Sequence, residues 1–578
     1  MRFFLKHLIY FLFLITTLLS GQEKYPKDDF ISPVDFPISL SGTFGELRTG
    51  HLHSGIDIRT QGVEGKPVKA IADGYVSRIV VSPFGYGKAI YIDHPNGYTS
   101  AYAHLQSFYP AVNEFVKNEQ YRRESFALDI KLLDKEFEVK QGQVIAKSGN
   151  SGSSGGPHIH FEIRDTDDEI PINPLFFGFK VKDFTRPQIQ RLLIYPHGQG
   201  SRVSGKTRYR EIELAGWGPV YRPKPGNDTI SVSGSIYFGI EAFDRHNDSQ
   251  MNNGVYSVKL LIDSVLVYSH RMDRFSFDET RQMLALIDYA YLVKNKKRIQ
   301  RTIVMPNNQL SIYEKVKYNG IYNFLESRIY RLQYVVGDVE GNESVLTFHI
   351  KGGQSDESQS AQGATLPEGV VLMRWDRTST FEREGFILEI PDEALFDTIH
   401  FKYSAGKPIS GGYSPVYNVH NQYTPILKSC NLSIKPQDFP PEKRDKLLIV
   451  KVDQASGKFT AAGGKWDDDF LSVKIREFGN YTVVADTKPP IITPVNVQNG
   501  KNISGQSTIR FNINDNLAGI ETYRATMNGE WILMEWDPKN NLLEYKIDER
   551  TKKGKNQLRL TVTDTSGNEA VYEASLVR

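Results

Sequence analysis

The chain has 578 residues, of which 39% are hydrophobic and 12% aromatic, and its formal net charge is +2. This length exceeds what one hydrophobic core can organise and predicts roughly four domains of about 150 residues each. The nearly neutral charge gives no reason to expect a nucleic-acid partner, and a single cysteine, Cys430, excludes a disulfide within the chain.

Residues 1–20 have the order of a secretory signal peptide: the basic start MRFFLKH, the apolar run LIYFLFLITTLLS, and then a polar continuation. The apolar run is shorter than the roughly 20 residues of a membrane-spanning helix. An uncleaved N-terminal anchor is the alternative. In either case we expect export, with the bulk of the chain in the periplasm or cell envelope.

Residues 31–184 read as one β-rich module that carries three histidine-containing segments. The first, GHLHSGIDIRT, holds His53 and Asp57 on either side of Gly55, which allows the bend that brings them together. The second, YTSAYAHLQSF, holds His104. The third, GGPHIHFEIRD, places His158 and His160 two residues apart, with a glutamate two residues further on.

The third segment has the period of a strand, so His158, His160 and Glu162 are predicted to share one face, opposite Ile159, Phe161 and Ile163. Taken alone, this pattern is also that of a polar outer face of a strand. A catalytic zinc keeps three protein ligands and one open position, which these segments could supply without thiolates. Spacing alone leaves the ligand set open, because His51 forms a second His-x-His pair with His53.

The rest of the chain is predicted to be scaffolding or recognition modules made of strands. We expect a β-sandwich over residues 185–352 with a helical insertion at Asp278–Asn295, a linker over 353–369, a β domain over 370–485, and a second β-sandwich over 486–578. The two sandwiches look like copies of one immunoglobulin-like module, since both contain D-x-x-G-N-E near their ends. Its aspartates, Asp338 and Asp564, could bind calcium, although turn residues before a last strand are the favoured reading.

The motifs HSGID, YAHL and GGPHIHFE, in this order, resemble those of the lysostaphin- and LytM-type zinc peptidoglycan endopeptidases. The likeness extends over about residues 40 to 165. It implies a small antiparallel β module, the duplicated hybrid motif fold, with a groove over Zn²⁺. Carried onto this sequence, it makes His53, Asp57 and His160 the zinc ligands and places His104 and His158 at the water and substrate position.

The resemblance implies a secreted metalloendopeptidase that cleaves the peptide part of peptidoglycan through a zinc-activated water. Two alternatives remain: a non-cleaving wall-binding or regulatory protein that uses the pocket for recognition, and a metallopeptidase acting on extracellular protein.

The chain departs from the compact members of this family by an insertion over residues 109–138, which could roof the groove. His51 would be structural or substrate-facing, and Glu162 either orients a ligand or is a surface carboxylate. The C-terminal sandwiches could dock a protein partner. The sequence does not tell the oligomeric state.

Overall fold

The computed structural model describes residues 25–132, 135–247, 249–354 and 369–578. The predicted signal peptide and most of the predicted linker lie outside these residues. Within them, antiparallel sheets dominate, which confirms the prediction of a mainly β chain. Among the described helices, none is both long and apolar enough to cross a membrane.

The N-terminal part contains a nine-stranded sheet in the order β1-β2-β11-β6-β5-β4-β8, with β9 and β12 beside it, and a three-stranded sheet, β3-β10-β7. The main hydrophobic core among these elements includes Ile56, Ile58 and the hydrophobic face of β11. The elements are β1 (Leu40–Gly42), β2 (Ile56–Arg59), β3 (Pro67–Lys69), β4 (Gly74–Val81), β5 (Lys88–Asp93), β6 (Tyr98–Ala103), β7 (Leu105–Phe108), α2 (Pro110–Arg123), β8 (Leu128–Lys131), β9 (Glu138–Val139), β10 (Val144–Ser148), β11 (His158–Asp165), β12 (Pro171–Ile172) and η1 (Pro174–Phe177).

The next part is a group of twelve paired strands around a second core. In β23, alternate residues such as Leu332 and Tyr334 are buried against Phe348 and Leu346 of β24, the period that a half-buried strand requires. The strands are β13 (Gln188–Val203), β14 (Arg210–Ile212), β15 (Leu214–Trp217), β16 (Val220–Pro223), β17 (Thr229–Phe243), β18 (Ser257–Ile262), β19 (Val265–Arg271), β20 (Gln300–Arg301), β21 (Tyr313–Val316), β22 (Tyr322–Asn323), β23 (Ile329–Gly337) and β24 (Glu343–Lys351), with the single turn η3 (Tyr318–Gly320).

The helix predicted over Asp278–Asn295 is wrong as one element. The structure has η2 (Thr280–Gln282), α3 (Met283–Leu286) and a separate α4 (Tyr289–Asn295). Ile287 between them is extended and pairs with Gln300. Asp288 then starts α4 anew, because its side chain accepts a hydrogen bond from the backbone N–H of Tyr291. The pairing of Ile287 with Gln300 interrupts the helix that the periodicity favoured, and the cap at Asp288 starts a second one.

Residues 370–485 form two sheets over one core, in the orders β25-β28-β29-β35-β31-β32 and β26-β27-β30-β34-β33. Cys430 is a buried free thiol in this core. The elements are β25 (Val370–Met373), β26 (Ser379–Arg383), β27 (Phe386–Ile390), β28 (Ile399–Pro408), β29 (Pro415–Val419), β30 (Pro425–Ile434), η5 (Pro441–Lys446), β31 (Leu447–Val452), β32 (Phe459–Gly463), β33 (Lys465–Asp467), β34 (Phe470–Glu477) and β35 (Gly479–Ala485).

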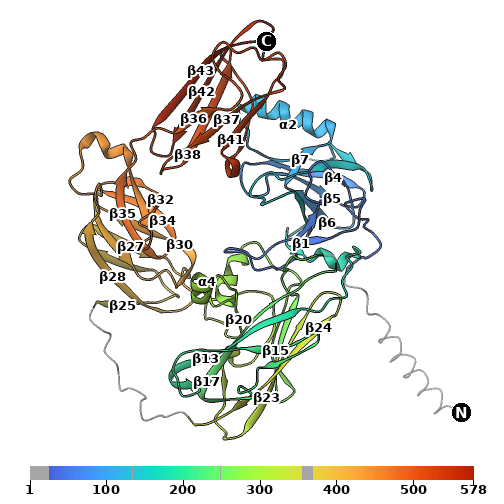
Figure 1. The fold of residues 1–578 in the computed structure, drawn as a ribbon, viewed down its shortest axis with the longest axis vertical. Coiled ribbons are helices and arrows are strands. Elements are labelled where there is room, and N and C mark those ends of the chain that lie inside the picture. The colour runs from blue at the N-terminus through green and yellow to red at the C-terminus, as the bar shows by residue number, and fades with distance from the viewer. Residues whose placement is uncertain (1–24, 133–134, 248, 355–368) are drawn as a thin grey trace, which may run out of the picture.

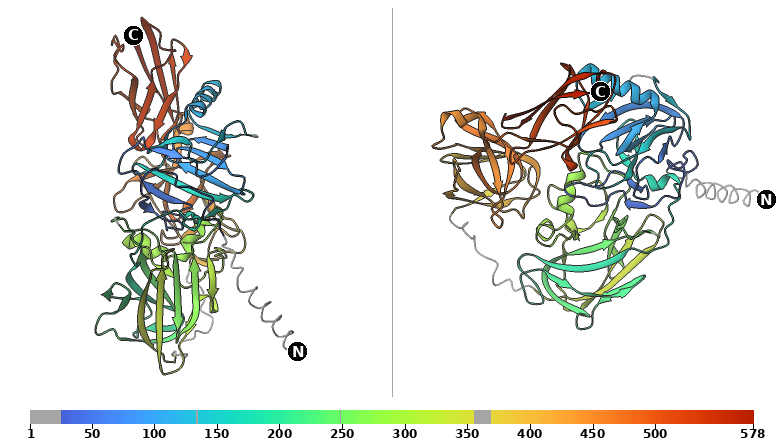
Figure 2. Two further views of the ribbon diagram at one scale, coloured as in Figure 1. Left: turned by 90° about the vertical axis from the view of Figure 1, so that its right-hand side faces the viewer. Right: turned by 45° about the horizontal axis from the view of Figure 1, so that its top comes forward.

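The C-terminal part has two four-stranded sheets, β36-β37-β41-β40 and β39-β38-β42-β43, again over one core. Its elements are β36 (Ile491–Pro494), β37 (Thr508–Asn514), β38 (Ile520–Met527), β39 (Glu530–Trp531), β40 (Met534–Asp537), η6 (Pro538–Asn540), β41 (Leu542–Lys546), β42 (Lys555–Asp564) and β43 (Glu569–Val577). The four parts follow one another around a ring, and the last part returns to α2 of the first (Figure 1; Figure 2).

The ring closes through the predicted insertion, which supplies α2. The Tyr121 hydroxyl donates to Asp548 Oδ2 at 2.6 Å, and its ring lies edge-on to Trp531 at 5.2 Å. Nearer the histidine motifs, Lys88 pairs with Glu535 at 2.8 Å, and Lys539 donates to the carbonyl of Asn150. The insertion, together with Lys88 and Asn150, therefore holds the C-terminal sheets beside the N-terminal part.

Replacing Tyr121 with alanine is expected to separate the C-terminal sheets from α2 and so to open the ring of four parts. The ring of Tyr121 lies under the Arg550 guanidinium, 3.5 Å from its centroid, and anchors Trp531. An aromatic anchor at the centre of an interface is worth about 2–4 kcal/mol. Small-angle X-ray scattering should show a larger radius of gyration for Tyr121→Ala and little change for Tyr121→Phe, which keeps the ring. An identical scattering curve for the alanine variant and the wild type would contradict the role given to this contact.

Candidate metal centre

Two neighbouring strands bring the first and third histidine segments together. Strand β11 pairs with β2 so that His160 lies opposite Asp57, and His53 lies just before β2. Gly55 sits between them where a Cβ would approach the carbonyl oxygen of Phe161 to 2.4 Å. A close approach of two backbones, in addition to a bend, therefore requires this glycine.

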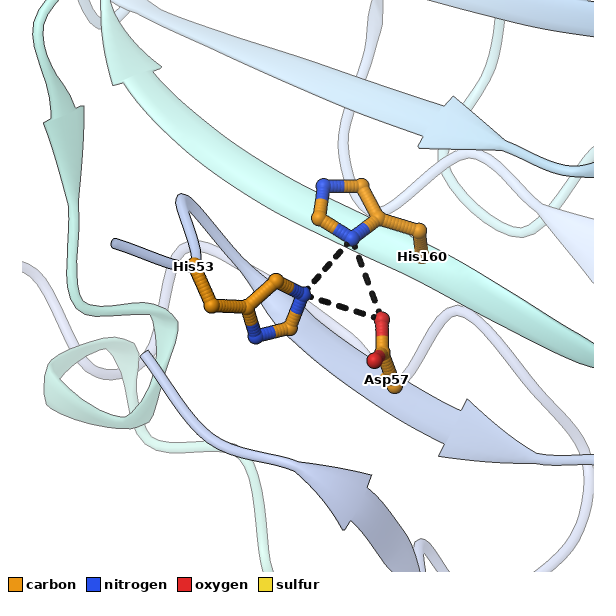
Figure 3. A group of neighbouring side chains, drawn as sticks. All are labelled: His53, Asp57 and His160. Carbon is orange, nitrogen blue, oxygen red and sulfur yellow. Dashed lines mark hydrogen bonds and ion pairs between the residues drawn. The ribbon is translucent and has the colours of Figure 1, made fainter. Parts of the chain in front are cut away.

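Three ligand-type atoms converge at this point (Figure 3). His53 Nε2 lies 2.9 Å from His160 Nδ1 and 3.1 Å from Asp57 Oδ1, and His160 Nδ1 lies 3.1 Å from the same oxygen. All three side chains are buried. Ligands at about 2.0–2.2 Å from a tetrahedral Zn²⁺ lie roughly 3.3 Å apart, so this triangle is close to the size that zinc requires.

Hydrogen bonds outside the triangle fix the orientation of both imidazoles. His53 donates from Nδ1 to the carbonyl oxygen of Thr43 at 2.8 Å, and His160 donates from Nε2 to Glu162 Oε1 at 2.7 Å. The two nitrogens that face each other are then both lone-pair atoms, beside the carboxylate of Asp57. Such an arrangement is repulsive unless a cation lies between them, and the residues therefore fit a divalent metal.

Glu162 is the centre of the network behind His160. It is fully buried, which excludes the surface-carboxylate reading, and it also accepts hydrogen bonds from Ser54, Tyr86 and Arg164. Burial works against its charge, but Arg164 and the bond from His160 hold the pKa of Glu162 well below its usual range. A permanent carboxylate thus fixes the ring of His160.

The same charges act on the ligands. Burial would lower the pKa of His160, but hydrogen bonds to Asp57 and Glu162 outweigh it and raise this pKa to about 9 in the absence of a metal. Burial is likewise outweighed at Asp57, where His53 leads the interactions that lower the pKa. In a metal-free protein, a proton is therefore held where a metal cation would otherwise bind.

The other two histidines stand beside the triangle. His104 and His158 lie with ring centroids 4.8 Å apart, and His158 Nε2 is 3.5 Å from Asp57 Oδ1. Each ring donates from Nδ1 to a backbone carbonyl, that of Ser151 at 2.9 Å for His104 and that of Gly156 at 2.8 Å for His158. Their Nε2 atoms remain available as proton acceptors.

His104 has a left-handed backbone, with φ of 59°, between β6 and β7. Such a conformation is rare for a residue with a Cβ and is found where a side chain must be aimed. Burial, followed by the charges of His160 and His158, lowers the pKa of His104 to about 3. The imidazole is therefore neutral at physiological pH, as a general base must be.

All five sequence-predicted residues are thus brought to one place, while His51 stays outside the triangle, exposed and close to the Thr49 carbonyl. Sequence reasoning missed Arg48, which binds Asp57 Oδ2 at 2.7 Å, and Tyr86, which stacks on His160. It also missed Arg164. That residue continues the two-residue period of His158, His160 and Glu162, so the pattern itself could have revealed it.

Replacing Glu162 with glutamine is expected to weaken metal binding about 10–100-fold, because the group that orients His160 loses its charge. The change also leaves Arg164 buried without its partner, which costs about 3–5 kcal/mol of unfolding free energy. Zinc titration and thermal unfolding would measure the two effects. Tyr86→Phe, which removes one hydrogen bond to the same carboxylate, is the matched control and should change both only slightly. Equal zinc affinity in Glu162→Gln and wild type would contradict this role.

Comparison with known proteins places the site in a family. The model described as peptidase family M23 matches residues 51–121 and 126–174, and one described as a Zu5-like domain matches residues 370–486. The DD-carboxypeptidase/endopeptidase Mpg of Neisseria meningitidis serogroup B is 33% identical over 140 residues, which are 24% of this chain and 26% of that protein. The murein hydrolase activator NlpD of Escherichia coli is 36% identical over 122 residues, which are 21% of this chain and 25% of that protein.

Among solved structures, the catalytic domain of lysostaphin from Staphylococcus simulans is 25% identical, with a TM-score of 0.19, and the match covers 25% of this chain and 93% of that domain. The chain spans about a quarter of the length of the curated relatives named above. The histidine triangle, its neighbours and the family match lie in the same residues. The N-terminal part of this chain is therefore a LytM-type domain of peptidase family M23.

Proposed function

We propose that the chain is a zinc metalloendopeptidase that hydrolyses peptide bonds in the stems or cross-links of peptidoglycan, exported to the periplasm or cell envelope. One observation carries the proposal: two imidazole nitrogens and one carboxylate oxygen meet within about 3 Å, beside two more histidines whose Nε2 atoms can accept protons. Relatives named as DD-endopeptidases support the substrate class.

His53, Asp57 and His160 would hold the zinc. When bound, zinc would lower the pKa of water from about 15.7 towards 7 and polarise a peptide carbonyl. His104 or His158 would take the proton of the attacking water at Nε2 and return it to the leaving amine. The other histidine, when protonated at Nε2 as well as at Nδ1, would donate to the oxyanion as it forms. Arg48 would hold Asp57 in place, since it bonds the oxygen that does not face the histidines.

A second candidate function is a non-cleaving regulator, because NlpD, a murein hydrolase activator, is also similar to this chain. The filled set of five residues favours hydrolysis.

The deciding experiment measures zinc content and digestion by the same preparation. Purified protein should contain about one tightly bound zinc per LytM-type domain and should release shorter peptides from cross-linked muropeptides, seen by liquid chromatography and mass spectrometry. Zinc without cleavage, together with stimulation of a separate amidase, would favour the regulator. Cleavage of an unrelated protein but not of muropeptides would point to a protein-directed peptidase.

A further inference from the structure

A second group of acidic side chains and a histidine lies at the seam between the LytM-type domain and the next sheets. Asp183 precedes β13, and Asp244 and His246 follow β17. One ligand atom from each lies within 4.8 Å of the others, and all three are buried. His246 Nε2 is 3.5 Å from Asp183 Oδ2 and 3.6 Å from Asp244 Oδ2. The three residues are referred to below as the seam cluster.

Asp244 is the feature that a purely structural role leaves unexplained. Asp244 is only 2% exposed, yet its Oδ1 has no hydrogen-bond partner among the described residues. A buried carboxylate oxygen without a partner costs several kcal/mol. The seam cluster and Asp338 line a cavity of about 20 Å³, whereas about 10–15 Å³ is enough for one water molecule. The cavity that Asp244 lines therefore has room for one ion.

The acidic groups in and beside the seam cluster also favour a bound cation. Burial, followed by the charges of Asp183 and Asp338, raises the pKa of Asp244 to about 8. Burial also raises the pKa of Asp338, to about 6, and lowers the pKa of His246. Three carboxyl groups and one imidazole therefore line a single small cavity.

The C-terminal sheets contain a counterpart of the seam cluster without a histidine. There, Asp486, Asp515 and Asp564 offer ligand atoms within 4.8 Å of one another. Asn568 donates from its backbone N–H and its side chain to Asp564, both at 2.8 Å.

The first copy has the same turn. Asn342 donates in both ways to Asp338, again at 2.8 Å. Turn geometry thus accounts for Asp338 and Asp564, as the sequence favoured, but not for the free Oδ1 of Asp244, nor for that of its equivalent in the second copy, Asp515. The copies differ two residues after their middle aspartate, where the first has His246 and the second has Leu517.

We propose that Asp183, Asp244 and His246 bind a divalent cation that accepts both carboxylate and imidazole ligands, for which Mn²⁺ is the probe. Mixed oxygen and nitrogen ligands suit such ions better than they suit Ca²⁺ or Mg²⁺. Asn253 is placed to orient the imidazole: its side-chain amide lies 3.5 Å from His246 Nδ1, and its own Oδ1 is buried without a partner. If the Asn253 amide were turned over, its Oδ1 would accept a hydrogen bond from His246 Nδ1. His246 Nε2 would then be free to bind the ion.

The position indicates what the cation would do. Thr43 lines the same cavity, its hydroxyl donates to the Gly254 carbonyl at 3.1 Å, and its own carbonyl accepts from His53. An ion in the seam cluster would tie the loops of the following sheets to the segment that orients His53. The site would therefore be structural, holding the two parts together.

The test compares the thermal unfolding of full-length wild type and Asp244→Asn, both stripped of metal and then titrated with Mn²⁺. Without metal, the variant should be about as stable as wild type, because the amide has the size of the carboxyl group and adds no charge. With Mn²⁺ at about 100 times its Kd, the Tm of wild type should rise by roughly 5 °C more than that of the variant. Both proteins contain the same candidate zinc site around His53, so Mn²⁺ bound there should raise both Tm values equally and leave their difference unchanged. Asp228→Asn, an exposed carboxylate of the same part, should behave as wild type.

Calorimetric titration adds the stoichiometry. Asp244→Asn should bind one Mn²⁺ fewer than wild type, and His246→Leu, which introduces the residue of the second copy, should bind Mn²⁺ at least tenfold more weakly. An unchanged number of Mn²⁺ sites in Asp244→Asn, or an equal Tm response in both proteins, would overturn the proposal. Equal Mn²⁺ affinity in His246→Leu would overturn the assignment of the imidazole as a ligand. Because none of these measurements uses peptidase activity, the outcome is independent of the proposed function.

Discussion

Replacing His160 with alanine is expected to remove the bound zinc and to reduce muropeptide cleavage to the level seen without enzyme. His160 supplies one corner of the triangle through Nδ1, and its ring is fixed by Glu162 and by the stacked Tyr86. Without it, two protein ligands remain, fewer than the three that a catalytic zinc keeps. Zinc content by mass spectrometry of the metal and digestion of cross-linked muropeptides measure the two losses.

The matched control is His51→Ala. His51 is a nearby histidine of the other His-x-His pair, but it is exposed and lies outside the triangle. This variant should keep its zinc. The sheet around His160 should survive the substitution, because the core face of β11 consists of Ile159, Phe161 and Ile163, which are untouched. A His160→Ala protein that keeps both zinc and activity would rule out the ligand set. One that loses zinc but still stimulates a separate hydrolase would favour the regulator.

Much of this site could be predicted from the two-residue alternation of one strand. The alternation in HIHFEIRD predicts which side chains share a face, and the structure puts the hydrophobic ones in the core and the polar ones at the triangle. The choice of His53 over His51 did not follow from spacing. It depends on the position that the loop before β2 gives to each imidazole. Contacts of this loop with the backbone of Thr43 and Phe161 determine that position.

Other features needed the tertiary structure because distant segments create them. The helix break at Ile287 results from pairing with Gln300, thirteen residues further on. The seam cluster joins Asp183 to Asp244, which are far apart in sequence. The predicted insertion could be recognised as an extra segment, but its contacts with Asp548 and Trp531 join opposite ends of the chain. No local pattern encodes such pairings.

Replacing His104 with alanine is expected to leave zinc bound and to lower kcat by about 100- to 1000-fold, which lies within the usual contribution of one positioned general base. The ring does not belong to the triangle: its centroid lies 6.0 Å from that of His160, and its Nδ1 is bound to the Ser151 carbonyl. Its loss therefore removes a proton acceptor without removing a ligand.

The left-handed backbone of His104 makes a second variant necessary. Alanine at a φ of 59° is strained, so a fall in activity could come from a shifted loop. Asparagine tolerates this conformation far better and has no group that can act as a base at neutral pH. His104→Asn should therefore match the wild-type Tm and zinc content and lose the same 100- to 1000-fold in kcat. If His104→Asn keeps full turnover while His158→Asn does not, the general base is His158 and the two assignments exchange.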